Sequence, residues 1–89
     1  MRKTDWRKLP ERYKGALQRY IEYGTHPGGF LLSVLENNLL NAFGYADDKS
    51  REDLYTIVMF IYNELPINCW GSTEKVNLWI ARRENERIR

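Results

Sequence analysis

The chain has 89 residues, of which 43% are hydrophobic, 13% aromatic and 29% charged, and its net charge at pH 7 is +2. A chain of this length can build only one core, and its aromatic content and mixed charge exclude a disordered polypeptide. Its apolar runs are too short to span a membrane, and no apolar stretch follows the first basic residues as it would in a signal peptide. We therefore expect a small cytoplasmic protein that folds alone or with copies of itself.

One cysteine, Cys69, and one histidine, His26, limit the chemistry open to the chain. An internal disulfide is excluded, which favours a reducing cytosol, and one His with one Cys cannot supply a zinc-ligand set. Catalysis would require these two residues to meet in space as base and nucleophile. We expect a protein that is not an enzyme, with no catalytic residue, no metal and no cofactor.

Residues 1–8 are predicted to form a flexible basic arm, and the first helix is predicted over residues 10–23. Pro10 suits the first turn of a helix, because it lacks the N–H that would go unpaired there. Apolar residues then recur three and four positions apart, and Gly24 can adopt the left-handed conformation that ends a helix.

A second helix is predicted from Phe30 to Phe43, and its wide apolar face suggests that it is the most buried helix. The preceding Pro27-Gly28-Gly29 turn has two interpretations. Bare backbone N–H groups at a helix start suit an anion, and a sharp corner between helices also requires glycine. The corner is favoured, because no Lys or Arg is nearby in the sequence.

A third helix is predicted to begin near residue 51, after Ser50 and Asp53 in the pattern of a capping box. Pro66 ends it. The β-branched and aromatic segment 55–62 also suits a strand. The cap, the acidic first turn and the length together favour a helix.

Ser72 is the predicted N-cap of a fourth helix, in which Val76, Trp79 and Ile80 supply the inner face. Just before it, Trp70 stands on a loop. An indole there could recognise a partner or could close the end of the core, and we favour the second role.

These elements predict an all-α fold, a compact bundle of about four short helices with a basic N-terminal arm. The chain divides into the arm at 1–8, a single helical domain at 9–82 and a charged tail at 83–89. The helical stripes assign the following residues to the core: Tyr13, Leu17, Tyr20, Ile21, Phe30, Leu31, Val34, Leu35, Leu39, Ile57, Val58, Ile61, Val76, Trp79 and Ile80.

Charge is distributed unevenly along the chain. Residues 1–19 have a net charge of +5, residues 20–74 of −6 and residues 75–89 of +3. The basic ends could bind the phosphates of a nucleic acid, or the terminal helices could lie beside the acidic middle and neutralise it. Neutralisation is favoured, because the net charge is near zero and no helix-turn-helix or glycine-rich phosphate loop is present.

Six short stretches form a distinctive set: Leu9-Pro10-Glu11-Arg12-Tyr13, Tyr20-Ile21-Glu22-Tyr23-Gly24, Pro27-Gly28-Gly29-Phe30-Leu31, Val34-Leu35-Glu36-Asn37-Asn38-Leu39, Tyr62-Asn63-Glu64-Leu65-Pro66 and Cys69-Trp70-Gly71-Ser72. Over residues 9–80 the set resembles a family of small uncharacterised bacteriophage and prophage proteins. Asn38 and Leu65 depart from the pattern of that family, which has Asp and Ala there. The resemblance implies a phage origin, and hence the cytosol of a bacterial host, and it implies no catalytic residue.

A small phage protein without enzymatic machinery is expected to act by binding. Our first hypothesis is a homo-oligomer, by default a dimer, that blocks a host protein or sequesters a small nucleotide signal to counter a host defence system. The alternative is a nucleic-acid-binding accessory or regulatory protein that uses the basic termini. The candidate residues for binding a ligand or partner are Arg12, Arg19, Tyr23, His26, Gly28, Gly29, Phe43, Tyr45, Tyr55 and Trp70.

Overall fold

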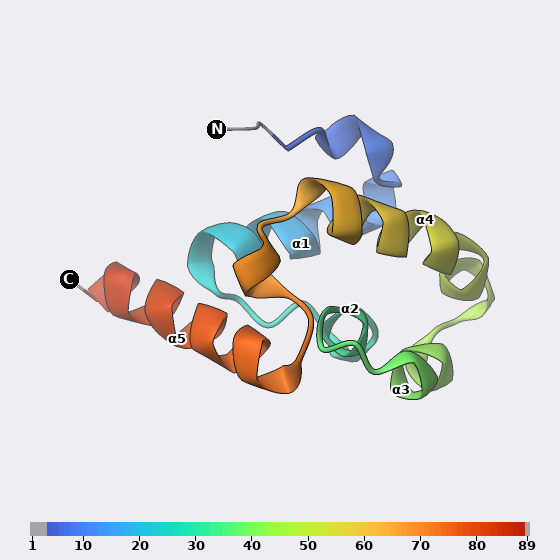
Figure 1. The fold of residues 1–89 in the computed structure, drawn as a ribbon. Helices are drawn as coiled ribbons and strands as arrows, with labels where there is room; N and C mark the ends of the chain where they lie inside the picture. The colour runs from blue at the N-terminus through green and yellow to red at the C-terminus, as the bar shows by residue number, and fades with distance from the viewer. Residues whose placement is uncertain (1–3, 89) are drawn as a thin grey trace.

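The computed structural model describes residues 4–88, and the side chains of residues 4–86 (Figure 1). Every regular element in this part of the chain is helical, which confirms the predicted all-α fold class and a helix rather than a strand at 55–62. The elements are η1 (Trp6–Lys8), α1 (Glu11–Tyr23), α2 (Gly29–Leu35), α3 (Leu39–Tyr45), α4 (Asp48–Glu64), η2 (Ile67–Cys69) and α5 (Thr73–Ile88), where η denotes a 3₁₀ turn.

Helix α1 ends where the sequence predicts, at a glycine. Gly24 has a φ of 71°, and its N–H bonds to the carbonyls of Arg19 and Tyr20. A Cβ on this glycine would lie 2.9 Å from the Cβ of Arg83 and 3.0 Å from the carbonyl oxygen of Ile80. Gly24 therefore turns the chain and also allows the end of α1 to approach the backbone of α5 closely.

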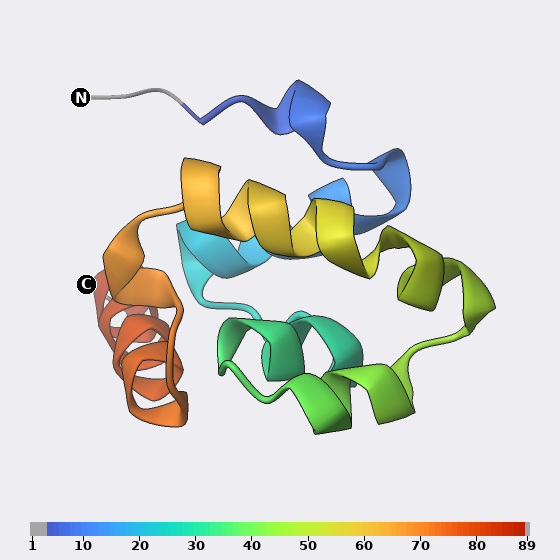
Figure 2. The same ribbon diagram turned by 45° about the vertical axis from the view of Figure 1, so that its right-hand side comes forward.

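The single helix predicted from Phe30 to Phe43 is wrong, because the chain breaks it into α2 and α3. Asn37 adopts a left-handed φ of 63°, which asparagine tolerates better than most residues. Asn38 then caps α3 by accepting a hydrogen bond from the Asn41 N–H (3.2 Å). The break folds α3 back beside α2, and the two helices lie together below α4 (Figure 2).

Helix α4 begins three residues earlier than predicted, and its N-cap is a different residue. Asp47 accepts a hydrogen bond from the Ser50 N–H at 2.7 Å, so Asp47 rather than Ser50 caps the helix. Ser50 is buried, and its hydroxyl oxygen lies 3.2 Å from the Tyr13 hydroxyl, which donates to Asp53 Oδ2 at 2.8 Å. The predicted capping box is therefore absent, and its two residues join α4 to α1.

The N-terminal segment lies against α4. Residues 1–3 of the expected arm lie outside the described residues. The next residues form the turn of η1, in which the ring of Trp6 packs against the ring of Phe60 with 5.2 Å between their centroids. This contact covers a core residue of α4 with an indole from the start of the chain.

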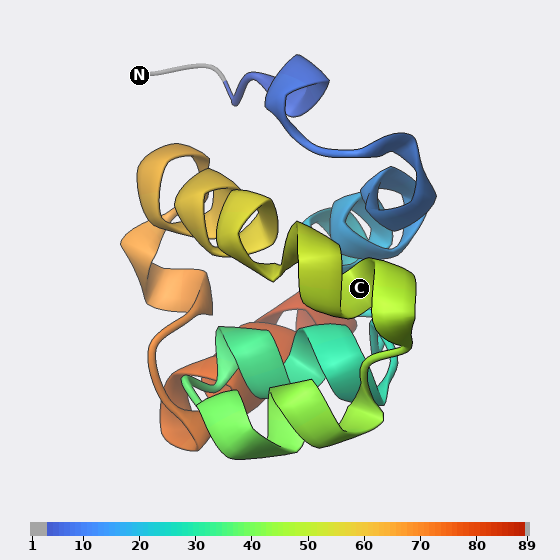
Figure 3. The same ribbon diagram turned by 90° about the vertical axis from the view of Figure 1, so that its right-hand side faces the viewer.

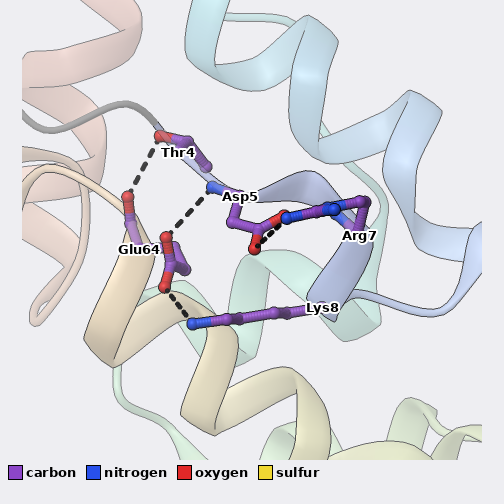
Figure 4. Close-up of polar contacts among 5 residues, drawn as sticks. All are labelled: Thr4, Asp5, Arg7, Lys8 and Glu64. Carbon is purple, nitrogen blue, oxygen red and sulfur yellow. Dashed lines mark hydrogen bonds and ion pairs between the residues drawn. The ribbon is translucent and has the colours of Figure 1, made fainter.

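A buried carboxylate at the end of α4 holds this segment (Figure 4). The side chain of Glu64 is only 1% exposed; its Oε2 lies 3.1 Å from the Lys8 ammonium, and its Oε1 accepts the Asp5 N–H at 3.0 Å. The Thr4 hydroxyl donates to the Glu64 backbone carbonyl at 3.1 Å. Hydrogen bonds and an opposite charge offset the cost of burying this carboxylate.

Helix α5 closes the core. It runs to Ile88, so residues 83–88 of the expected tail are helical, and Arg89 lies outside the described residues. Val76 is fully buried, and the Trp79 indole donates to the backbone carbonyl of Tyr20 at 3.1 Å. The buried apolar residues form one cluster: Leu9, Tyr13, Leu17, Tyr20, Leu31, Leu35, Ile57, Phe60, Ile61, Leu65, Cys69, Val76 and Trp79.

The predicted core is largely confirmed, with two errors. Leu39 is 62% exposed and Val58 is 45% exposed. Leu39 lies outside the core because the helix break turns α3. Val58 lies on a partly open face of α4.

We expect Leu35→Ala to lower the free energy of unfolding by about 2–5 kcal/mol, because Leu35 is fully buried and its truncation leaves a cavity. The matched control is Leu78→Ala on α5, where the leucine is 59% exposed and the change should stay within about 0.5 kcal/mol. Urea denaturation of both variants measures the difference. Equal losses would show that the assigned core is wrong.

The cap of α4 should make stability depend on acid pH. The hydrogen bond from the Ser50 N–H and that from Arg12 lower the pKa of Asp47 from its ordinary 3.8 to about 2. A lowered pKa contributes stability that is present above pH 4 and is lost as the pH falls towards 2.

Asp47→Asn keeps a capping oxygen but cannot ionise. We therefore expect the variant to melt below the wild type at pH 7, and the gap to narrow between pH 4 and pH 2. Melting curves followed by circular dichroism measure this gap. A gap that stays constant over that range would contradict the assigned role of the Asp47 charge.

Candidate interaction surface

The two residues considered for catalysis have different surroundings. Cys69 in η2 is fully buried, and burial raises the pKa of its thiol from 9.0 to about 12. His26 is exposed between α1 and α2, where its Nδ1 accepts a hydrogen bond from the Gly28 N–H (3.0 Å). Cys69 therefore lacks the accessible, electropositive setting in which a thiolate nucleophile forms.

Within the part of the chain that the structure describes, no three His, Cys, Asp or Glu residues are grouped so that they could hold a metal ion. None of the helices in that part is both long and apolar enough to cross a membrane. The surface offers a different kind of site.

A groove of about 470 Å³ lies between α4 and the pair α2–α3, which Figure 3 shows as two layers. Val34 of α2 and Leu39 and Ala42 of α3 line one wall. This wall exists because Asn37 and Asn38 break the chain there and turn Leu39 away from the core. The two asparagine residues also line the groove and are exposed.

The opposite wall is a face of α4. Leu54, Val58, Ile61 and Tyr62 line it at spacings of three and four, so they share one side of the helix. The neighbouring side of α4 faces the core. Since the segment 55–62 is apolar almost all the way round, α4 fills the core and still presents apolar side chains to the groove.

Trp70 and Gly71 line the groove beside these two walls. The Trp70 indole donates to the Leu65 carbonyl (3.4 Å), and its ring packs 5.8 Å from the ring of Tyr62, centroid to centroid. The Gly71 N–H donates to the Leu35 carbonyl at 2.7 Å, which satisfies the end of α2. Trp70 is half-buried, so it both covers the core and borders the groove.

Apolar side chains continue from the groove onto open surface. Leu40 is 83% exposed and Tyr62 is 71% exposed, and Phe43 and Tyr55 are exposed as well. Tyr55 lies one helical turn from Val58 on the same side of α4. We call the groove together with Phe43 and Tyr55 the groove face; Leu40 lies about 100° around α3 from Leu39, outside it. None of these residues carries a charge at neutral pH.

A guanidinium lies at the margin of the groove face. The Arg51 side chain stacks over the Phe43 ring with 4.5 Å to the centroid, and its Nε donates to the Phe43 carbonyl at 3.3 Å. Asp48 lies 3.8 Å from the same guanidinium. Arg51 therefore joins the start of α4 to α3, and a carboxylate balances its charge.

The structure brings three of the residues predicted for binding onto the groove face: Phe43, Tyr55 and Trp70. The two predicted arginines lie elsewhere. Arg12 forms a 2.8 Å ion pair with Asp47. The Arg19 guanidinium lies against its own helix, close to Gly15.

The remaining predicted residues cluster around the turn into α2 or stand alone. The Tyr45 ring lies over Gly29, where a Cβ would come within 3.3 Å of it. This close approach supports the corner interpretation of the turn. His26 and Gly28 bond to each other, and Tyr23 is exposed at the end of α1.

Sequence reasoning missed Leu40, Val58, Tyr62 and Arg51 as surface residues of interest. The helical period placed Val58 in the predicted core, and it left Leu40 without a predicted role. The sequence did hold a signal for these exposed residues: the apolar faces of the predicted second and third helices are wider than one neighbouring helix can cover. The Asn37-Asn38 pair was a second signal, because asparagine favours left-handed and capping positions.

Five of the basic residues near the two ends of the chain pair with carboxylates. The ion pairs are Arg7–Asp5 (3.0 Å), Lys8–Glu64 (3.1 Å), Arg12–Asp47 (2.8 Å), Lys14–Glu11 (3.5 Å) and Arg83–Glu86 (2.8 Å). Two of them join the basic N-terminal part to the acidic middle. Such surface pairs add little stability, but they reduce the positive potential available to a polyanion.

No protein-family model, curated protein or solved structure matches this chain. The fold and surface define a small all-α protein that carries an uncharged apolar groove face.

The buried thiol supplies a prediction. We expect Cys69 in the folded protein to react with a disulfide reagent at pH 8 about 100-fold or more slowly than in the unfolded chain, because it is buried and its thiolate is disfavoured. Absorbance of the released thiol, with and without guanidinium chloride, measures both rates. Equal rates would show that the thiol is accessible.

Proposed function

We propose that this chain is a non-enzymatic phage protein that works as a homo-oligomer and acts by binding a protein of its bacterial host. The observation that carries the proposal is the groove face, which is apolar and uncharged on a chain in which 29% of all residues are charged. Contiguous apolar surface of this kind marks protein–protein contact sites on small proteins. The resemblance to phage proteins makes a host protein the natural target.

A protein partner is favoured over a small nucleotide signal. A nucleotide phosphate requires Arg, Lys or converging backbone N–H groups. The groove has no Lys or Arg in its lining, and the guanidinium of Arg51 at its margin is already engaged by Asp48 and a carbonyl. The surface therefore suits apolar and amide contacts.

The alternative, a nucleic-acid-binding protein, rests on a different part of the surface. Lys75 and Arg82 of α5 border a hollow of about 180 Å³ beside Trp79. The Lys75 ammonium is within 3.4 Å of the Ile67 carbonyl, which leaves Arg82 as the more available cation of the two. Two cations in one hollow are far fewer than the several phosphate contacts that sustain nucleic-acid affinity.

Native mass spectrometry of the protein purified from infected cells tests the proposal. We expect ions at multiples of the 10.7 kDa chain, a further species whose added mass is that of a host protein, and no retained nucleotide. Electrophoretic mobility of a 30-base-pair DNA at 50 mM salt is the companion measurement, and we expect no shift at micromolar protein. A monomer that carries a nucleotide, or a salt-sensitive DNA complex, would replace the proposal with one of its rivals.

A further inference from the structure

We propose that a hollow on α5 binds one dianionic phosphate group, as carried by a small organic phosphate monoester. The hollow has a volume of about 180 Å³ and lies where η2 meets α5 (Figure 1). Lys75, Leu78, Trp79 and Arg82 of α5 line it together with Asn68 of η2. It shares no lining residue with the groove, so this inference stands apart from the proposed function.

The hollow gathers positive charge that no carboxylate neutralises. Within residues 4–86, every lysine and arginine side chain except those of Arg19, Lys75 and Arg82 forms an ion pair with a carboxylate. Two of these three exceptions line the same hollow. Unneutralised positive charge gathered in a concave place attracts an anionic ligand.

The sequence of α5 explains why these two cations lack a partner. On a helix, the side chains that can pair are three and four positions apart. Lys75 has no acidic residue at those positions. Arg82 has one, Glu86, but its carboxylate lies 2.8 Å from the guanidinium of Arg83. Arg83 in turn stacks over the ring of Trp79, with 4.4 Å to the centroid. Neither cation of the hollow is therefore neutralised from within the helix.

The placement of the polar groups suits a single anion. Lys75 and Arg82 are seven positions apart, which is about two helical turns, and Trp79 lies between them on the same side of α5. The Lys75 ammonium lies 3.4 Å from the Ile67 carbonyl, which holds it beside η2. Asn68 is exposed there, and its amide offers two neutral donors. An anion in the hollow meets a cation at each end and an amide from η2.

Charge and size together select the ligand. Two cations complement a phosphate monoester, which carries a charge of about −1.5 to −2 at pH 7, better than the single charge of a carboxylate, a sulfonate or a phosphodiester. The volume is below the range of about 300–1,000 Å³ in which proteins enclose a whole organic ligand. The hollow therefore holds the phosphate, and the body of the molecule lies over Leu78, which is 59% exposed.

The binding is expected to be weak. Lys75 and Arg82 are both exposed, so each contact with the phosphate competes with water and with salt. We expect a dissociation constant of roughly 1 mM at low ionic strength. A ligand held so weakly dissociates during purification, which agrees with the expectation that no nucleotide is retained.

A titration of the full chain with phenyl phosphate, followed by the backbone amide resonances of residues 75–82, tests the inference. At low salt and about pH 7.5 this probe is a dianion. Benzenesulfonate is the matched probe, because it has the same ring and a tetrahedral anionic group with one charge. Inorganic phosphate is the probe without an organic body. We expect phenyl phosphate to bind about fivefold or more tightly than either.

Three variants locate the site. Lys75→Gln and Arg82→Gln each remove one cation of the hollow, and we expect each to weaken phenyl phosphate binding about fivefold or more. Arg19→Gln is the matched control, because Arg19 is the third unpaired cation and is an exposed residue of α1, outside the hollow. We expect this variant to bind as the wild type does. Unchanged circular dichroism shows that each variant is folded.

The contrary outcomes are distinct. No change in the resonances of residues 75–82 overturns the site. Equal losses in all three variants also overturn it, since binding would then follow net charge alone. Benzenesulfonate that binds as tightly as phenyl phosphate overturns the preference for a dianion, and inorganic phosphate that does so overturns the monoester. None of these results bears on the groove face.

Discussion

Tyr20 is the residue on which the packing of this fold depends. Its side chain is fully buried, its hydroxyl donates to the Cys69 carbonyl at 2.7 Å, and its own carbonyl accepts the Trp79 indole N–H at 3.1 Å. Burial raises the pKa of the Tyr20 hydroxyl, so it stays a hydrogen-bond donor across the physiological range. One residue thus joins α1, η2 and α5 with polar groups that could not be left unpaired in the core.

The position of the groove depends on the contacts of Tyr20, because Cys69, which Tyr20 binds, is followed directly by two residues that line the groove. Because Tyr20 holds η2 in place, the next residues, Trp70 and Gly71, are fixed where they line the groove. The Gly71 N–H bonds to the last carbonyl of α2, and this contact ties the α2–α3 layer to the loop after α4. The groove is therefore bordered by segments that the core already holds, which favours a preformed binding surface over one that must be ordered on contact.

Charge and apolar surface are kept apart in this protein. Carboxylates pair with Arg7, Lys8, Arg12 and Lys14 in the N-terminal segment and α1. The most deeply buried of these carboxylates, Glu64, holds Lys8 and the backbone of Asp5. The groove face, in contrast, presents leucine, valine, aromatic and asparagine side chains. This separation leaves the uncharged surface free to bind by shape and amide hydrogen bonds.

The sequence by itself determined the all-α class, the extent of α1 and most of the core, because local periodicity and terminating glycine and proline residues act within a few positions of each other. It did not determine the burial of Ser50 or the contacts of Glu64, because these depend on partners 37 to 60 positions away. It did not determine the break at Asn37 either, because the left-handed backbone there competes with a continuing helix. Tertiary structure alone decided that Leu40 and Val58 face outward. A helical period marks the apolar sides of a helix, but only the number of neighbouring helices decides which of those sides is covered.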